Sequence, residues 1–465
     1  MKIITPVIAR DSELIFGHAP HPITCGHGVI IGGGMVHPEI KFTLPPIEIM
    51  EDTWQKIREI YTEMITDICR RCVDLHCSTL VVEFELLPPM THKPQWGSEI
   101  TELIRNILEE FHEKYGLNSA FRVTPVDIRD NERPPRLRSG DLLEKTLKTF
   151  DLCARAGADL LSIESTGGKE LHDHALVWGD LGAIIFSLGV LAPRDMDFLW
   201  SEIADICRKT NTIPAGDSAC GFANTAMVMA DRGMIPKTLA ALVRVASVPR
   251  SLMAYMKGAQ GPSKDCAYEG PYLKVLSGIP ISMEGKSSAC AHLSPVGNIA
   301  ACCADLWSNE SVQNVRLLSG PAPVVSMEQL IYDTRLMNVG LQEGRESALK
   351  LRDWLAQSDS PLDPQAYVLR PDVVLKICNR LAPATSPLEM TFFAVEETLA
   401  ILRDALERKK LAIPEREIHW LDLLSAQLEI LPRDEDALWR QVKLALGDIK
   451  INPEEYLLPP FIPQS

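Results

Sequence analysis

The chain has 465 residues, of which 62 are acidic and 47 basic, so its formal net charge is −15. Such a balance disfavours nucleic-acid binding, because a polyanion would be repelled overall. The longest apolar stretch, residues 181–193, is shorter than the 18 or so residues of a membrane span, and no signal-peptide pattern is visible. The 12 cysteines are too few for a disulfide scaffold. We therefore expect a cytoplasmic protein whose cysteines are thiols or metal ligands.

The chain divides into three zones that differ in residue composition and in hydrophobic periodicity. Residues 1–50 are rich in Gly, Pro and His and predict an extended N-terminal segment packed on the main domain. Residues 51–325 alternate short β-rich runs with amphipathic helical patterns, beginning with TWQKIREIYTEMITDICRRCV and TLVVEFE. This rhythm indicates right-handed βαβ units and a parallel sheet. About 275 residues of it favour an α/β fold of the closed (β/α)8 TIM-barrel type, with an open doubly wound sheet as the alternative.

The third zone, residues 326–465, contains few strand candidates and many helical patterns. Ser386 and Glu389 have the spacing of a capping box that opens a long amphipathic helix, with Pro387 at its first position. We interpret this zone as a helical C-terminal layer packed on the barrel.

Polar residues of ligand type follow three apolar runs. Glu164 ends ADLLSIE, Asp217 and Cys220 lie in IPAGDSAC, and Asp265 and Cys266 lie in GPSKDCAYEG. In a barrel the carboxyl ends of the strands form one mouth, where such side chains can converge. Two thiolates and one carboxylate suit a catalytic zinc ion, since three protein ligands leave the fourth position open. Spacing alone leaves the more common alternative open, in which the cysteines are small buried hydrophobic residues.

Longer motifs surround these residues. IESTGGKE, GDSAC with ANTAM downstream, and GPSKDCAYE are accompanied by VEFELLPPM, VPRSLMAY, MEGKSSACAH, CCADLWSNESV and DPQAY. In this order, over most of residues 55–370, the chain resembles the methanol:corrinoid methyltransferase family, the zinc-bearing, methanol-activating subunits of methylotrophic methanogens and acetogens. The resemblance is weak in the first 50 and the last 80 residues.

The resemblance implies one zinc ion per chain, held by Glu164, Cys220 and Cys266. It also implies that zinc acts as a Lewis acid on the oxygen of methanol while a Co(I) corrinoid attacks the methyl carbon. A carboxyl group could handle the hydroxyl proton, and the candidates are Glu83, Glu85 and Asp363.

The corrinoid itself is expected on a separate small protein that docks over the barrel mouth. The nearest fragment to a cobalt-binding D-x-H-x-x-G loop, residues 74–79 (DLHCST), lacks the final glycine. Because Co(I) is easily oxidised, an anaerobic host is implied, and the family resemblance suggests a homodimer.

Several other residues attract notice but have simpler explanations. Cys69 and Cys72 have redox-type spacing inside a helical pattern, where nothing lowers a thiol pKa. His292 is a candidate hydrogen-bond donor to a zinc ligand, and Lys264 or Lys286 could offset the negative charge of the site. Core packing or a loop position is the simpler interpretation for a further set: Cys290, Cys302, Cys303, His172 and His174.

Three rival functions stay open at this point. The same site could act on another methoxy or methyl donor. The chain could be a non-catalytic scaffold that only holds a corrinoid protein. A metal-free barrel enzyme such as an aldolase would need a Schiff-base lysine and a phosphate loop, and neither is clear in the sequence.

Overall fold

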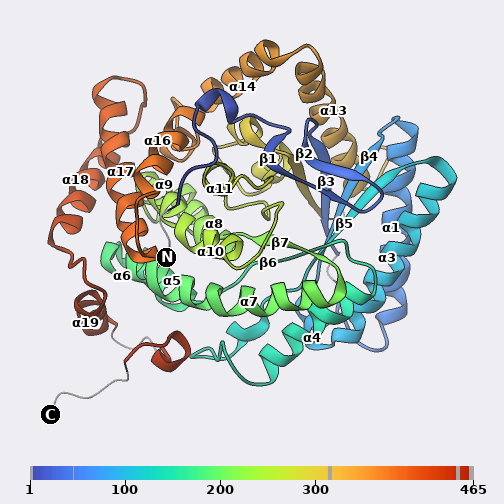
Figure 1. Cartoon of the computed structure of the whole chain (residues 1–465), viewed down its shortest axis with the longest axis horizontal. Coiled ribbons are helices and arrows are strands. Elements are labelled where there is room, and N and C mark those ends of the chain that lie inside the picture. The colour runs from blue at the N-terminus through green and yellow to red at the C-terminus, as the bar shows by residue number, and fades with distance from the viewer. Residues whose placement is uncertain (1–3, 45–46, 313–316, 447–450, 460–465) are drawn as a thin grey trace.

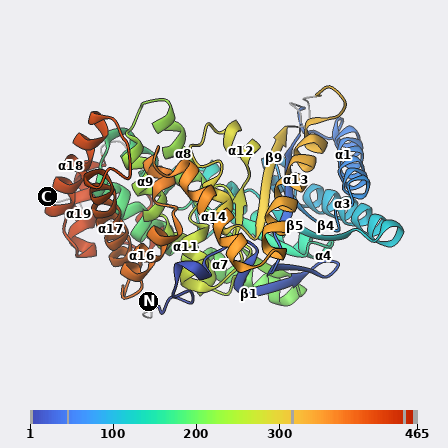
Figure 2. The same cartoon turned by 90° about the horizontal axis from the view of Figure 1, so that it is seen from above.

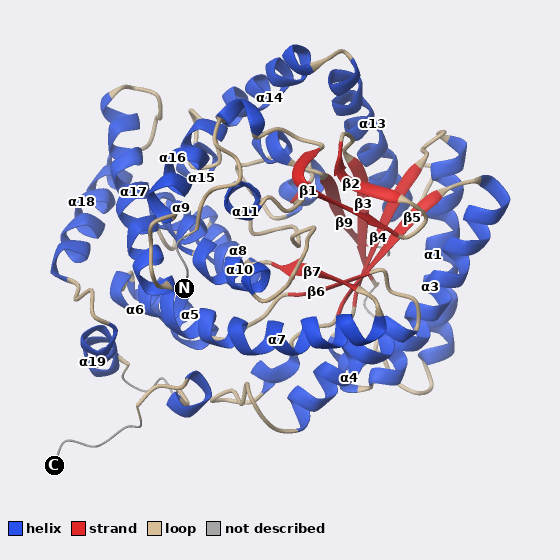
Figure 3. Ribbon diagram, viewed as in Figure 1, coloured by secondary structure: helices blue, strands red, loops and turns tan. Residues whose placement is uncertain are grey.

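The computed structural model describes residues 4–44, 47–312, 317–446 and 451–459. Its centre is a seven-stranded parallel sheet with the strand order β7-β6-β5-β4-β3-β9-β8 (Figure 1; Figure 3). The strands are β3 (His37–Thr43), β4 (Thr79–Glu85), β5 (Asn118–Thr124), β6 (Leu160–Ile163), β7 (Ile213–Asp217), β8 (Ser282–Glu284) and β9 (Leu306–Val312).

An irregular eighth segment, residues 260–263, joins the two ends of this sheet. The Gly261 amide donates to the Ala215 carbonyl of β7 at 2.8 Å, and Ser263 forms a parallel bridge with Ile281 next to β8. The first strand, β3, pairs along its whole length with the last, β9. The predicted (β/α)8 barrel is therefore confirmed, and an open doubly wound sheet is excluded.

Helices surround the barrel and bury one apolar face each. In the first of them, α1, the side chains of Ile57, Ile65 and Ile68 are buried and recur at helical spacing. The helices up to residue 342 are α1 (Trp54–Asp74), α2 (Pro88–His92), α3 (Pro94–Tyr115), α4 (Asp141–Arg155), α5 (Lys169–Trp178), α6 (Leu181–Phe186), α7 (Ala192–Thr210), α8 (Cys220–Asp231), α9 (Lys237–Ala246), α10 (Val248–Met256), α11 (Gly270–Ser277), α12 (Lys286–Ala291) and α13 (Ala322–Gln342).

The C-terminal zone is helical, as predicted; its helices after residue 370 gather at one end of the molecule, whereas the helix Arg345–Asp359 lies nearer the middle (Figure 2). The zone consists of α14 (Arg345–Asp359), α15 (Pro364–Tyr367), α16 (Pro371–Leu381), α17 (Pro387–Glu407), α18 (Glu415–Ile430) and α19 (Glu435–Ala445). The longest of these, α17, packs against α9 and α16. It begins where the Ser386 hydroxyl accepts a hydrogen bond from the Glu389 amide at 3.1 Å, which is a standard helix N-cap.

The N-terminal segment has two roles. Strands β1 (His18–Cys25) and β2 (Val29–Gly33) form an antiparallel pair, and their Ile23 and Ile31 side chains pack against Val81, Ala120 and Leu160 at the amino end of the barrel. Residues 1–50 also contribute β3, which lies between β4 and β9. This part of the chain therefore closes the amino end of the barrel and supplies one strand of its wall.

Charged side chains occupy the inside of the barrel. Lys41, Glu83 and Arg122 are neighbours in register across β3, β4 and β5, and all three are buried. The Arg122 Nε lies 3.0 Å from Oε1 of Glu39, which is also buried. The interior is consequently a network of paired charges as well as a packed core.

Two expectations from composition can be compared with the structure. Within the described residues, no helix combines the length and the hydropathy needed to cross a membrane. All twelve cysteines lie in the described part of the chain, and each is a free thiol.

Candidate metal centre

Three side chains converge at the carboxyl end of the barrel. Glu164 follows β6 directly, Cys220 is the first residue of α8 after β7, and Cys266 lies in the loop after the eighth segment. Their ligand atoms all lie within 4.8 Å of one another. The structure thus brings together the three residues that the family resemblance assigns to zinc.

The donor set fits a zinc ion. Two ligands of one tetrahedral zinc lie roughly 3.5–4 Å apart, given Zn–S bonds of about 2.3 Å, so small side-chain shifts would close the 4.8 Å cluster around an ion. Thiolates also select zinc over harder cations such as magnesium. Glu164 is 26 % exposed, which leaves the cluster accessible from the barrel mouth.

The two thiol sulfurs lie within 4.8 Å of each other. The interaction with Cys266 lowers the pKa of Cys220, but burial and the nearby Glu164 carboxylate outweigh it and raise the pKa to about 11. The same interaction, together with burial, raises the pKa of Cys266 well above its ordinary value. Metal binding requires both thiolates, so it would release protons.

Lys264 links one ligand to the carboxylates of the barrel wall. Its Nζ lies 2.9 Å from Glu164 Oε1, 3.2 Å from Glu83 Oε1 and 3.4 Å from Glu85 Oε2. Burial would lower the pKa of Lys264, but these carboxylates hold it well above its usual range. The lysine therefore remains a cation inside the site, as expected for a residue that offsets negative charge.

A second lysine, Lys41 of β3, was not predicted from the sequence. Its buried Nζ lies 3.3 Å from Cys266 Sγ and 3.5 Å from both Asp265 Oδ1 and Glu85 Oε2. Burial would raise the pKa of Asp265, but Lys41 and Lys264 hold it well below its usual range. The alternation in HPEIKFT was the available signal, since it places Lys41 on the inner face of a strand.

Asn224 was also not predicted as part of the site. Its Nδ2 donates to Cys220 Sγ at 3.2 Å. Asn224 lies four residues after Cys220 in α8, so the helix places both on one face. That i, i+4 spacing could have identified it.

A buried arginine fixes the segments that carry two of the ligands. Arg250 of α10 donates to Asp217 at 2.8 Å and to the Ser165 carbonyl at 2.9 Å. Ser165 follows Glu164, and Asp217 ends the strand that leads to Cys220. Asp217 therefore acts through this pairing, and its contacts are those of a positioning residue.

The Cys266 loop is tied to the same region by Glu269. Its Oε1 accepts hydrogen bonds from the Ala219 amide and from the Ser251 hydroxyl, both at 2.7 Å. Ala219 directly precedes Cys220. The backbone around the two cysteines is thus held together by one buried carboxylate.

The carboxylates predicted for proton handling lie in two places. Glu83 is buried, accepts from Thr124 Oγ1 at 2.7 Å, and leaves its Oε2 without a hydrogen-bond partner in the described structure. Burial raises the pKa of Glu85. Both belong to the cluster around Lys264.

Asp363 is engaged elsewhere. It caps α15 by accepting from the Gln365 amide at 2.9 Å, and it pairs with Lys237 at 2.8 Å. These contacts link the C-terminal layer to α9, and they are typical of a structural carboxylate.

The remaining candidates are scattered. His292 Nδ1 lies 3.0 Å from Oε1 of the buried Glu284, and this carboxylate raises the pKa of the imidazole. Lys286 pairs with Asp333 at 3.0 Å. The other histidines and cysteines that were singled out from the sequence lie apart from the ligand cluster. They are either buried in packed regions (His172, Cys69, Cys72, Cys302, Cys303) or exposed (His174, Cys290).

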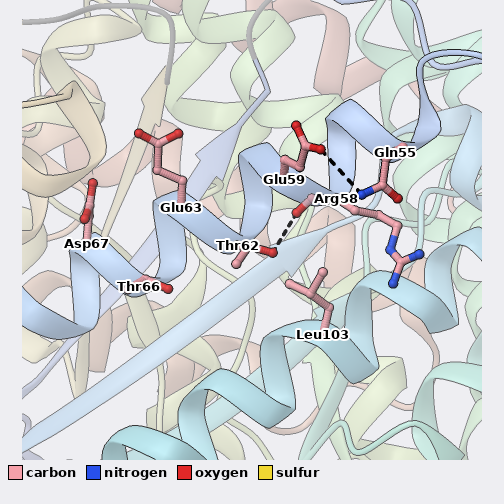
Figure 4. Close-up of a pocket in the computed structure, with 8 residues that line it drawn as sticks. All are labelled: Gln55, Arg58, Glu59, Thr62, Glu63, Thr66, Asp67 and Leu103. Carbon is pink, nitrogen blue, oxygen red and sulfur yellow. Dashed lines mark hydrogen bonds between the residues drawn. The ribbon is translucent and has the colours of Figure 1, made fainter.

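One groove on the outer surface is large but lacks such convergence. Figure 4 shows its lining, which comes from α1 and from Leu103 of α3, around a volume of about 440 Å³. Gln55 bonds to Glu59, and Thr62 to the Arg58 carbonyl, so these side chains are satisfied along their own helix. The ligand-type side chains converge at the barrel mouth instead.

Known proteins match the chain over nearly its whole length. The model of the family described as the methanol-cobalamin methyltransferase B subunit matches residues 6–456. A methanol–corrinoid protein co-methyltransferase of Methanosarcina barkeri (strain Fusaro / DSM 804) is 39 % identical over 373 residues, which cover 79 % of this chain and 80 % of the relative. The crystal structure of the methanol:cobalamin methyltransferase complex MtaBC from Methanosarcina barkeri contains a chain that is 35 % identical. That match has a TM-score of 0.93 and covers 98 % of this chain and 99 % of the other.

These matches confirm the predicted family and, with it, a methyltransferase enzyme. They agree with the barrel and with the motifs that surround the ligand cluster. The chain belongs to the methanol-cobalamin methyltransferase B subunit family.

Proposed function

We propose that this chain transfers the methyl group of methanol to the Co(I) corrinoid of a partner protein, with one zinc ion held by Glu164, Cys220 and Cys266. The observation that carries the proposal is the convergence of these three ligands at the open end of the barrel. The family and the activity of the 39 % identical relative support methanol as the donor.

Zinc, when bound, would supply Lewis-acid polarisation of the methanol oxygen. Transfer of the methyl group to cobalt would break the C–O bond, so the chain would have to supply a proton for the leaving hydroxyl group to depart as water. We assign this task to Glu83 and Glu85, which share Lys264 with the ligand Glu164. Asp363, the third predicted carboxylate, has contacts that support a structural role instead.

The exposure of the ligand residues indicates the side from which a corrinoid protein would reach the site. Cys266 is buried, whereas Glu164 and Cys220 are only partly covered. A corrinoid protein seated over the mouth would approach this partly covered side and exclude water from it. The related chain from Methanosarcina barkeri was crystallised within such a methanol:cobalamin methyltransferase complex. We extend the assembly to this chain, as a homodimer with one corrinoid protein per subunit in an anaerobic cytoplasm.

A donor panel tests the function. The zinc-loaded chain is mixed with Co(I) corrinoid protein and with methanol, methylamine, a methoxyarene or methanethiol, and methyl–cobalt formation is followed by absorbance. Methanol alone should support rapid methylation. Activity with another donor but not with methanol would overturn the substrate and keep the chemistry. No methylation from any donor, despite full zinc content, would favour the scaffold function.

A further inference from the structure

Each thiol of the ligand cluster has its own nitrogen donor from a different part of the fold. Asn224 Nδ2 of α8 lies 3.2 Å from Cys220 Sγ, and Lys41 Nζ of β3 lies 3.3 Å from Cys266 Sγ. One donor is a neutral amide and the other is a buried ammonium group. Lys264 stands in the same relation to Glu164, at 2.9 Å.

These donors suit the sulfurs in their metal-binding form. As a thiol, Cys266 donates to Asp265 Oδ1 at 3.2 Å. That bond depends on the thiol proton, which ligation removes. The N–H groups of Lys41 and Asn224 remain and face stronger acceptors. The Asn224 Oδ1 has no hydrogen-bond partner among the described residues, so the contact with sulfur is the bond that orients its amide.

We propose that Lys41 and Asn224 tune the metal by withdrawing charge from its two thiolate ligands. Two thiolates and one carboxylate place three negative charges around a divalent ion, which weakens its Lewis acidity. A hydrogen bond to each sulfur lowers the energy of the sulfur lone pair and restores part of that acidity. The inference rests on the proposed metal site, but it does not depend on methanol as the donor.

Cobalt(II) substitution makes the sulfurs visible without any methyl transfer. The wild-type chain, Asn224→Ala and Lys41→Met are each loaded with one Co²⁺ per chain, and the thiolate-to-cobalt charge-transfer band is recorded. Loss of a hydrogen bond raises the sulfur lone pair, so the band should move to lower energy in both variants. Thr225→Ala, the next residue of α8, and Lys286→Met, a lysine paired with Asp333, should leave it unchanged.

The outcomes separate tuning from structural support. Lys41→Arg keeps the charge and should return the band toward its wild-type energy. Methyl transfer should fall about 10–100-fold in the two tuning variants at full metal content. An unchanged band in Asn224→Ala and Lys41→Met would overturn the proposal. Loss of Co²⁺ binding in both would also overturn it, because the side chains would then assemble the site. If the band shifts but methanol proves inert, the tuning stands and only the proposed substrate falls.

Discussion

The guanidinium of Arg250 lies 2.8 Å from the Asp217 carboxylate, and neither side chain is exposed to solvent. This pair joins α10 to the end of β7, immediately before the Cys220 segment. Charges buried in this way are stable only together, since either one alone would lack compensation.

Arg250→Met should therefore lower the free energy of unfolding by about 3–5 kcal/mol, because it leaves Asp217 buried without its partner. Urea unfolding followed by circular dichroism measures the change. Arg403→Met provides the control, since Arg403 pairs with Asp422 at the surface and should cost at most about 1 kcal/mol. Equal losses in the two variants would contradict the assigned importance of the buried pair.

Removal of a ligand should remove the metal. Cys220→Ser, Cys266→Ser and Glu164→Gln should each bring zinc from about one ion per chain to a small fraction, because three protein ligands are the minimum for such a site. Elemental analysis of the purified protein gives the stoichiometry. Cys290→Ser, at an exposed thiol, should keep its zinc. Full zinc content in all three ligand variants would show that the metal binds elsewhere.

Proton handling can be separated from metal binding with amide variants. Glu83→Gln and Glu85→Gln should reduce turnover by about 10²–10⁴-fold, the usual contribution of a general acid or base, while zinc is retained. Asp363→Asn should mainly affect stability, because its contacts are a helix cap and Lys237. Steady-state methyl transfer and zinc content are measured on the same samples. Unchanged turnover in Glu83→Gln and Glu85→Gln would remove the role from both carboxylates.

The His292–Glu284 pair predicts a pH dependence. The nearby Glu284 carboxylate raises the pKa of His292 above 6.5, so the folded protein binds this proton more tightly than the unfolded chain does. The stability it contributes is full below about pH 6.5 and is lost as the pH rises through the raised value. Titration of the His292 ring by NMR should give a midpoint above 6.5. In Glu284→Gln the midpoint should fall, and an unaltered midpoint would refute the pairing.

The barrel could be predicted from the sequence, because buried parallel strands and amphipathic helices leave clear periodic patterns. Strand β3 was harder to recognise, since HPEIKFT has charged residues at alternate positions where an ordinary strand core has apolar ones. Glu39 and Lys41 face a polar barrel interior, where Arg122 and Asp265 pair with them. A hydrophobic pattern alone does not predict a strand whose inward-facing side chains are charged.

Part of the candidate site could be predicted from the sequence, and part became visible only in the structure. Glu164, Cys220 and Cys266 stand in long motifs, so the resemblance could select them before any geometry was known. Asn224 contacts Cys220 within one helix at i, i+4 spacing, so a local pattern could have indicated it, whereas Lys41 contacts Cys266 only through tertiary packing. Lys41 is 225 positions from Cys266, and no local pattern links two residues at that separation.

The pairing of β3 with β9 also constrains how the protein is made. The first strand of the barrel pairs with β4 early, but its other edge stays unpaired until the strand that begins at Leu306 has been made. A chain emerging from the ribosome can fold successive βα units, but its barrel stays open until about two thirds of the polypeptide has been synthesised. Lys41 and Cys266 come from early and late parts of that interval, so they can meet only near its end. The metal centre is therefore a late product of synthesis, and premature termination before β9 would yield a protein with ligands but without a finished site.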